Sequence, residues 1–207
     1  LELDISNLIK VDVDQFFGIE YDEFAVRVAE VAMWLIDHQM NIKVSNQFGQ
    51  YFVRLPLKKS AKIVHGNALQ IDWESVVLKD DCLQLGDYNI SQRRKDAKGF
   101  EGVNKGLNYI LGNPPFVGKS YQNSQQKADM NLVLSSVKGA GVLDYVTAWY
   151  IKASQLIQNT NIRCAFVSTN SVSQGEQVGI LWQELFTKYK IKIHFAHRTF
   201  SWNNEAK

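Results

Sequence analysis

The stretch YILGNPPFVGKS, residues 109–120, holds the side chains best suited to chemistry in this sequence. It ends in Gly-Lys-Ser, as a phosphate-binding loop does, but that motif places four residues between its two glycines. Here Gly112 and Gly118 are separated by five residues. Pro114 and Pro115 have no backbone N–H, whereas a phosphate cradle is a run of N–H donors. The stretch is therefore not predicted to bind a nucleotide phosphate.

The same two prolines favour a different kind of site. They fix their own torsions and hold the Pro114 carbonyl in one direction. The Asn113 side-chain oxygen adds a second acceptor, and Phe116 places an aromatic face beside both. We call residues 113–116 the clamp. Two acceptors and a ring suit a planar group with an NH2, which is either the exocyclic amine of a base or a carboxamide.

A proline-rich turn packed under a sheet is the structural alternative for the clamp. The elements around it decide between the two interpretations. Hydrophobic patterning predicts strands over 15–20, 61–65, 107–111, 162–168 and 191–196, and helices over about 22–40, 142–158 and 176–189. The clamp directly follows the third of these strands, where ligands bind in α/β sheets, so a binding role is favoured.

Alternation of strand and helix predicts an α/β fold with an open, mostly parallel, doubly wound sheet. The strand at 162–168 is apolar enough to be buried on both faces. We expect residues 1–207 to form a single domain, in which the polar segment 80–106 is a surface excursion. The 45% of hydrophobic residues suit one compact core rather than two.

Composition excludes several classes of protein. No apolar run reaches the roughly 20 residues that span a bilayer, and the sequence shows no charged-then-apolar leader, so we expect a cytoplasmic protein without membrane contact. Cys82 and Cys164 form neither a disulfide framework nor a metal set. His194 and His197 would point to opposite faces of a strand, so no metal site is expected.

The net charge does not indicate a strongly basic surface that binds nucleic-acid phosphates, because the sequence has 23 basic and 21 acidic residues. The polar residues after the clamp are interpreted as a loop that either contacts a DNA backbone or is merely solvated. They are Lys119, Gln122, Asn123, Gln125, Gln126 and Lys127.

Beyond these patterns, the sequence resembles a known family over nearly its whole length. Asn-Pro-Pro-Phe matches the fourth motif, (D/N/S)PP(Y/F), of amino methyltransferases that use S-adenosylmethionine, and the Asn form is typical of enzymes that methylate adenine N6 in DNA. Six segments, the motif's own among them, resemble the methyltransferase region of MmeI-like (Type IIL) restriction-modification proteins. They are FFGIEYDEFAVRVAEVAMWLIDHQMN, HGNALQIDW, GNPPFVGKSYQNSQQKADM, LDYVTAWYIKASQLI, AFVSTNSVSQGEQVGILW and IHFAHRTFSWNNEAK.

The resemblance implies a Rossmann-like methyltransferase that transfers a methyl group from S-adenosylmethionine to the N6 amine of adenine in duplex DNA. The target base would be flipped out of the duplex. Asn113, Pro114 and Pro115 would hold the amine, and Phe116 would stack on the base. Phe200 resembles the second stacking aromatic, with Trp202 as the alternative choice.

The resemblance also implies a cofactor site at two strand ends. Glu20 closes the first predicted strand, where an acid in doubly wound folds accepts hydrogen bonds from ribose hydroxyls; capping of the next helix is its alternative role. Tyr21 would pack on the cofactor adenine. Asn67 and the neighbouring Ala68 match the third motif, where many relatives carry Asp.

One family motif is missing. The glycine-rich turn that wraps the methionine part of the cofactor is absent from the sequence, and we expect it upstream of Leu1, in a longer protein. The chain would then lack the first and last strands of the full fold. Alone, we expect it to bind S-adenosylmethionine weakly, to be inactive, and to self-associate through unpaired strand edges.

Two other functions fit the same residues. A similar clamp holds a glutamine carboxamide in methyltransferases that act on proteins at glutamine N5. A DNA-binding remnant that keeps the fold without catalysis is the second, and the intact clamp counts against it.

Overall fold

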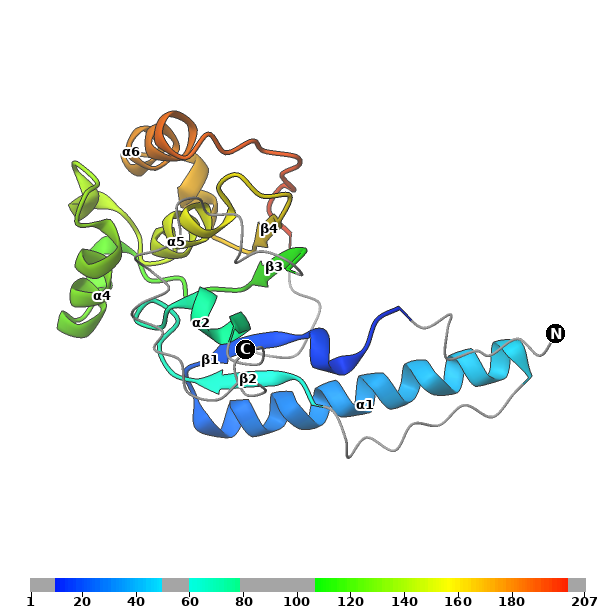
Figure 1. The fold of residues 1–207 in the computed structure, drawn as a ribbon. Helices are drawn as coiled ribbons and strands as arrows, with labels where there is room; N and C mark the ends of the chain where they lie inside the picture. The colour runs from blue at the N-terminus through cyan, green and yellow to red at the C-terminus, as the bar shows by residue number, and fades with distance from the viewer. Residues whose placement is uncertain (1–9, 50–59, 79–106, 201–207) are drawn as a thin grey trace, which may run out of the picture. The chain divides into compact units, whose positions relative to one another are not determined.

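The computed structural model describes residues 10–49, 60–78 and 107–200. The chain divides into two compact units, within residues 1–98 and 99–207. Each unit holds one two-stranded parallel sheet, so the fold is mixed α/β with short parallel sheets (Figure 1). The predicted excursion at 80–106 lies outside the described residues.

The first unit is a strand, a long helix and a second strand that returns parallel to the first. Phe17 pairs with Lys62 and Glu20 with His65, and α1 packs along both strands (Figure 1). Its elements are η2 (Val13–Gln15), β1 (Phe17–Glu20), α1 (Glu23–Phe48), β2 (Lys62–His65) and α2 (Trp73–Leu78). The strand predictions at 15–20 and 61–65 are confirmed.

Local side chains explain where α1 begins and ends. The Asp22 carboxylate accepts a 2.8 Å hydrogen bond from the Ala25 N–H, which caps the helix as its position predicts. The helix runs past the predicted end near residue 40 and stops at Gly49, whose φ of 66° suits glycine. Within the added turns, Asn41 donates to Asp37 and Ser45 donates to the Asn41 carbonyl, so polar residues support the helix without an apolar pattern.

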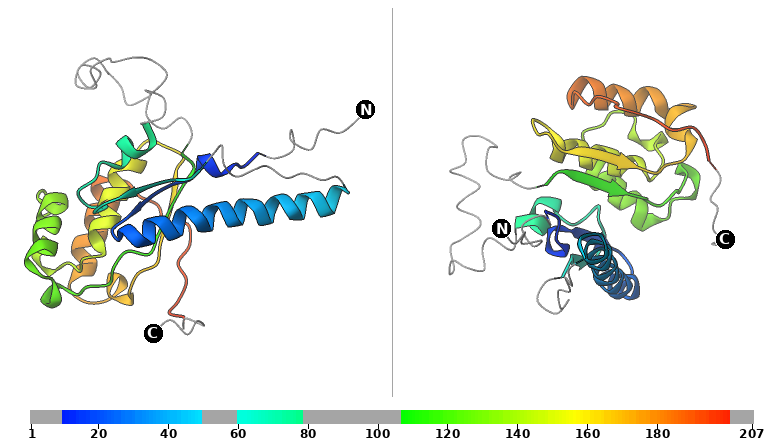
Figure 2. Two further views of the ribbon diagram at one scale, coloured as in Figure 1. Left: turned by 90° about the horizontal axis from the view of Figure 1, so that it is seen from below. Right: turned by 90° about the vertical axis from the view of Figure 1, so that its right-hand side faces the viewer.

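The second unit pairs Tyr109 with Arg163 and Gly112 with Phe166 in a parallel ladder (Figure 2). Helix α5 packs against β4 and α4, and α6 packs against η5. The elements are β3 (Tyr109–Gly112), η3 (Lys119–Tyr121), α4 (Ser124–Leu134), η4 (Ala140–Val142), α5 (Thr147–Ile157), β4 (Arg163–Phe166), η5 (Asn170–Ser173), α6 (Gln177–Gln183) and the π-helix η6 (Glu184–Lys188). The core gathers on α5, α6 and their flanks, with Leu143, Val146, Ala148, Ile151, Leu181 and Leu185 fully buried.

Three predictions for this unit are wrong. Residues 191–196 form no strand: Phe195 is 77% exposed, and no ladder joins the segment to another described residue. A β-like pattern is not enough when no neighbouring strand accepts its hydrogen bonds. Strand β4 is not buried on both faces, since Arg163 and Ala165 are exposed.

The third concerns the predicted polar loop after the clamp, which is helical from Ser124 onward. Asn123 and Gln126 form a reciprocal capping box, with bonds of 2.8 and 3.0 Å. An Asn followed three residues later by Gln is a sequence signal for a helix start, and the polar composition concealed it.

Two features are absent from the residues that the structure describes. None of the helices there is both long and apolar enough to cross a membrane. Within the same ranges, no three His, Cys, Asp or Glu residues gather as metal ligands would.

Candidate active site

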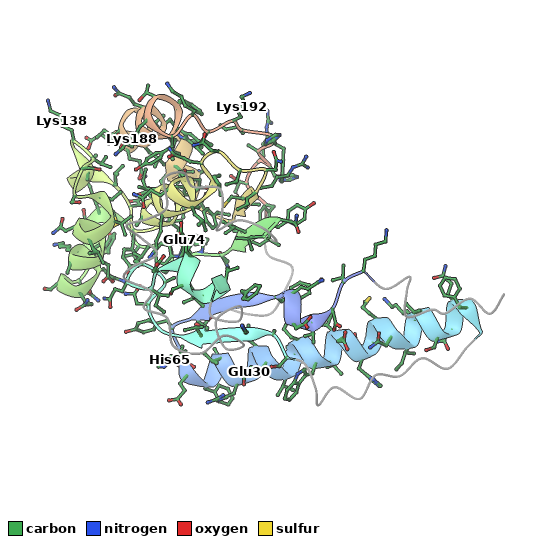
Figure 3. All side chains as sticks on the ribbon, viewed as in Figure 1. Glu30, His65, Glu74, Lys138, Lys188 and Lys192 are labelled. Carbon is green, nitrogen blue, oxygen red and sulfur yellow. The ribbon has the colours of Figure 1, made fainter. Side chains whose placement is uncertain are left out.

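The carboxyl ends of β1 and β2 meet in the first unit and bring predicted cofactor residues together. The Gly66 N–H donates a 2.8 Å hydrogen bond to the Glu20 carbonyl. His65, at the end of β2 in Figure 3, donates from Nε2 to the Tyr21 carbonyl at 2.9 Å. The two strand ends are therefore tied by both backbone and side chain, and Tyr21 is left 73% exposed beside them.

The Glu20 carboxylate organises the turn between β1 and α1. Its Oε1 accepts from the N–H groups of Tyr21 at 2.8 Å and of Asp22 at 3.2 Å. Among the described residues, none donates to its Oε2. One oxygen thus fixes the carboxylate and the other remains an acceptor, while Asp22 caps the helix.

Asn67 and Ala68 form the turn that follows β2. The Asn67 Oδ1 accepts from the Leu69 N–H at 2.9 Å, and its carbonyl accepts from the Gln70 and Ile71 N–H groups. The Ala68 carbonyl accepts from the Trp73 indole at 2.8 Å. The Asn67 side-chain oxygen, at the position that matches the third motif, is therefore engaged in the turn.

The clamp lies at the carboxyl end of β3 in the second unit. The Val167 N–H donates to the Gly112 carbonyl at 3.0 Å, which continues the ladder up to the residue before Asn113. Pro114 is buried, whereas Asn113 is exposed and Phe116 is 43% exposed. No described residue forms a hydrogen bond with the Asn113 side chain or the Pro114 carbonyl. Both predicted acceptors are therefore unpaired within the described part of the chain.

A small aromatic cluster supports β3 and β4 beneath the clamp. A Cβ on Gly112 would lie 3.1 Å from two atoms of the Phe166 ring, so glycine permits this close packing. The Phe166 ring packs edge-on against Tyr150, whose hydroxyl shares a 2.9 Å hydrogen bond with the Ser168 hydroxyl. Burial raises the pKa of Tyr150. The hydrogen bond to Ser168 lowers it by less, so the net change is upward. Tyr150 is thus a neutral packing group at physiological pH and not a base.

The loop after the clamp is anchored by residues that the sequence did not single out. The Tyr145 N–H donates to the Val117 carbonyl at 2.9 Å, and the Lys119 N–H donates to the Asp144 carboxylate at 3.0 Å. The Lys119 ammonium also pairs with Glu176 at 3.0 Å, in an exposed bridge of small energetic weight. Asp144 lay inside a segment predicted to be helix, and only its charge in an otherwise apolar run, VLDYV, marked it.

The two candidates for a second stacking aromatic are placed differently. Phe200 is half-exposed and packs edge-on against His197, with ring centroids 6.1 Å apart. It follows the segment 191–196 that is not a strand, so the argument that placed it by strand position loses its basis. Trp202 lies outside the described residues.

Each unit is thus an α/β element with polar and aromatic side chains at the carboxyl ends of its parallel strand pair. The chain belongs to the family of the MmeI DNA-methyltransferase domain, which it matches over residues 1–207. This confirms the resemblance to Type IIL restriction-modification proteins.

Two relatives show the extent of the similarity. DNA methyltransferase A of Bacillus subtilis (strain 168) is 40% identical over 199 residues, which cover 95% of this chain and 20% of that protein. A solved structure of the Type IIL restriction-modification enzyme MmeI in complex with DNA is 53% identical, with a TM-score of 0.78, and the match covers 99% of this chain and 24% of that one. The chain spans about a fifth to a quarter of the length of these relatives.

Proposed function

We propose that this chain is the catalytic part of an enzyme that methylates the N6 amine of adenine in duplex DNA, with S-adenosylmethionine as methyl donor. The observation that carries the proposal is the clamp. Directly after β3, neighbouring residues of the chain carry two oxygens without hydrogen-bond partners among the described residues and an exposed ring. Membership of a DNA-methyltransferase family makes a base the favoured planar substrate over a protein carboxamide.

The clamp would act by binding and orienting the amine. The two amine hydrogens would be donated to the Asn113 Oδ1 and the Pro114 carbonyl, which favours a nitrogen whose lone pair points away from the ring plane. Positive charge that develops on the nitrogen during transfer would be stabilised by the same two oxygens. Pro115 keeps the turn stiff, and Phe116 would stack on the base after it leaves the duplex. The nitrogen gains the methyl group and then loses one hydrogen as a proton to solvent water, so the chemistry requires neither a covalent intermediate with the protein nor a strong base.

The residues at the ends of β1 and β2 fit the cofactor. S-adenosylmethionine supplies the methyl group from its sulfonium centre when it is bound. The Glu20 Oε2 is an acceptor at a strand end and suits a ribose hydroxyl, and the exposed Tyr21 ring suits an adenine face. Asn67 and Ala68 would border the adenine, with Asn67 in a weaker role because its oxygen also serves the turn.

The proposal extends to the whole domain. We propose that both units belong to one Rossmann-like methyltransferase domain, because each holds parallel strands joined through helices. We further propose that it works in the cytoplasm as part of a restriction-modification protein, and that Phe200 or Trp202 supplies a second stacking ring. The isolated chain would bind cofactor weakly, lack activity and associate through its strand edges.

The test is Asn113→Ala in the complete protein that contains this chain. Methyl transfer from tritiated S-adenosylmethionine to unmethylated plasmid DNA should fall on the order of 100-fold or more, because one of two oriented acceptors is lost. Digestion of wild-type product to nucleosides should place the label on N6-methyladenine. Asn131→Ala, at an exposed position on α4, is the matched control and should keep wild-type activity.

Two results would contradict the proposal. Undiminished transfer by Asn113→Ala would mean that another group holds the substrate. Label in protein and none in DNA would favour the glutamine methyltransferase, which the same assay detects by acid precipitation after nuclease treatment.

A further inference from the structure

We propose that Asp144, oriented by Gln177, is a positioning residue that sets the direction of the clamp oxygens. The inference rests on the proposed function of the clamp and concerns a carboxylate to which neither the family match nor the motif gives a role. It starts from the number and direction of the hydrogen bonds at Asp144.

Asp144 is held by its backbone at the start of α5. Its carbonyl accepts from the Thr147 N–H at 3.0 Å and from the Thr147 hydroxyl at 2.7 Å. Thr147 is fully buried, and the next residue of the helix and the two residues before Thr147 are buried as well. The Cα of Asp144 is therefore fixed to a densely packed part of the second unit.

The carboxylate joins three segments that are distant in sequence. Its Oδ1 accepts from the Lys119 N–H at 3.0 Å, three residues after Phe116. Its Oδ2 accepts from the Ser171 hydroxyl on η5 and from the Gln177 amide on α6, each at 2.7 Å. One side chain thus connects the clamp loop, the start of α5 and the segment beyond β4.

Gln177 fixes the rotation of that carboxylate. It is 6% exposed, donates from Nε2 to the Asp144 Oδ2, and accepts from the Asp144 N–H at 3.0 Å through Oε1. The pair is reciprocal, so rotation of the Gln177 amide breaks two bonds at once. All three donors to the carboxylate are uncharged, and the Lys119 ammonium bonds to Glu176 instead. These hydrogen bonds therefore fix the orientation of the Asp144 carboxylate and contribute little charge attraction.

The consequence is a loop held at both ends. At one end the Gly112 carbonyl is fixed to Val167, and at the other Asp144 holds Lys119 and Tyr145 holds Val117. The two prolines of the clamp remove two φ torsions between these anchors. Few freely rotating backbone torsions remain between the anchors, so a shift of either anchor must move the clamp residues. A displacement of about 1 Å at a reacting group costs on the order of 100-fold in rate.

Three variants of the complete protein test this role. Asp144→Asn replaces one carboxylate oxygen by an NH2 group, which can take either of two positions. In one position it faces the Gln177 Nε2 and in the other it faces the Lys119 N–H, so a donor meets a donor in both. In Gln177→Glu, two carboxylates face each other. In the double variant, the new carboxylate at position 177 accepts from the new amide and the backbone N–H at position 144. The amide oxygen at position 144 again accepts from Lys119, and the Ser171 hydroxyl becomes an acceptor.

We expect each single variant to lower kcat about 10- to 100-fold on unmethylated plasmid DNA, with the dissociation constant for S-adenosylmethionine changed less than about twofold. The double variant should recover most of the lost activity. Hydrogen exchange gives a readout independent of activity. The Lys119 amide should lose protection in Asp144→Ala, which removes its acceptor, and should keep it in the double variant.

Serines on η5 provide a matched pair if Asp144 variants fail to fold. Ser171→Ala removes the bond to Asp144 and the bond between the Ser171 and Thr169 hydroxyls, whereas Ser173→Ala removes a bond to the Asn170 carbonyl only. Ser171→Ala should lower kcat severalfold and Ser173→Ala should not.

The proposal is overturned if Asp144→Asn keeps wild-type kcat, if the double variant recovers nothing, or if the two serine variants behave alike. Failure of the proposed function looks different: Asn113→Ala would retain methylation, while exchange at Lys119 would still report whether Asp144 holds the loop.

Discussion

Gly66 donates its backbone N–H to the Glu20 carbonyl at 2.8 Å, so the turn after β2 is joined to the last residue of β1. Gly66 has a φ of 150°, which L side chains rarely adopt, and an added Cβ would lie 2.7 Å from the Ile71 Cδ1. The bond, the backbone conformation and the missing side chain together set the edge where Glu20, Tyr21 and Asn67 lie.

Gly66→Ala is therefore expected to loosen this edge. The backbone conformation costs about 1–3 kcal/mol for a non-glycine residue, and the end of the Ile71 side chain must also move. Hydrogen exchange of the Gln70 and Ile71 amides, which bond to Asn67, should speed up by at least about tenfold in the complete protein. Gly141→Ala is the control, since an added Cβ there meets no atom within 4 Å. Equal exchange in the two variants would show that the turn tolerates a side chain.

Glu20→Gln tests the assignment of the second carboxylate oxygen. The amide oxygen can still accept from the Tyr21 and Asp22 N–H groups, but an NH2 replaces the acceptor proposed for a ribose hydroxyl. Loss of a hydrogen bond to a charged group should raise the dissociation constant for S-adenosylmethionine about 10- to 100-fold, as measured by calorimetry. Asp22→Asn keeps the helix cap and should bind as the wild type does. If both variants bind normally, Glu20 serves only the turn.

Much of the first unit follows from sequence patterning, because its signals are local. Apolar runs at 15–20 and 61–65 predicted β1 and β2, and the acid at position 22 predicted the start of α1. The end of α1 could not be predicted by the same method, since its last turns are supported by Asn41 and Ser45 and not by an apolar stripe.

The second unit shows where local patterns fail. Residues 191–196 alternate as a strand does, but strand formation depends on a partner elsewhere in the chain. Asp144 was missed for a related reason: its partners Lys119, Ser171 and Gln177 lie 25 to 33 residues away, and no spacing reveals them. The clamp residues could be singled out because they are contiguous in the sequence, and their role as a substrate site stays a prediction.

Phe116 is the clamp residue whose exposure is most informative. An exposed ring next to two acceptors without described partners suits a stacked base, and such stacking is worth about 1–3 kcal/mol per base. Phe116→Ala should lower kcat/KM for plasmid DNA about 10- to 100-fold, and Phe116→Tyr should stay near wild type. Phe186→Ala, which removes an exposed ring stacked on Trp182 on α6, controls for general loss of aromatic packing. Equal losses in Phe116→Ala and Phe186→Ala would indicate a packing role.

Cys164 lies on β4, where burial raises its pKa to about 12. The thiolate is the reactive form, so at about pH 8.5 almost none is present. Alkylation by iodoacetamide should be at least about tenfold slower than for glutathione, and peptide mass spectrometry separates Cys164 from Cys82. In guanidinium chloride the two should react at similar rates.

Because the pKa of Cys164 in the fold lies above the usual value of about 8.5, the unfolded state loses its proton first, and the fold becomes less stable as the pH rises from there toward 12. Below about pH 8.5 the thiol is neutral in both states and this dependence vanishes. Native Cys164 that reacted with a midpoint near the usual thiol pKa would show that β4 opens readily to solvent.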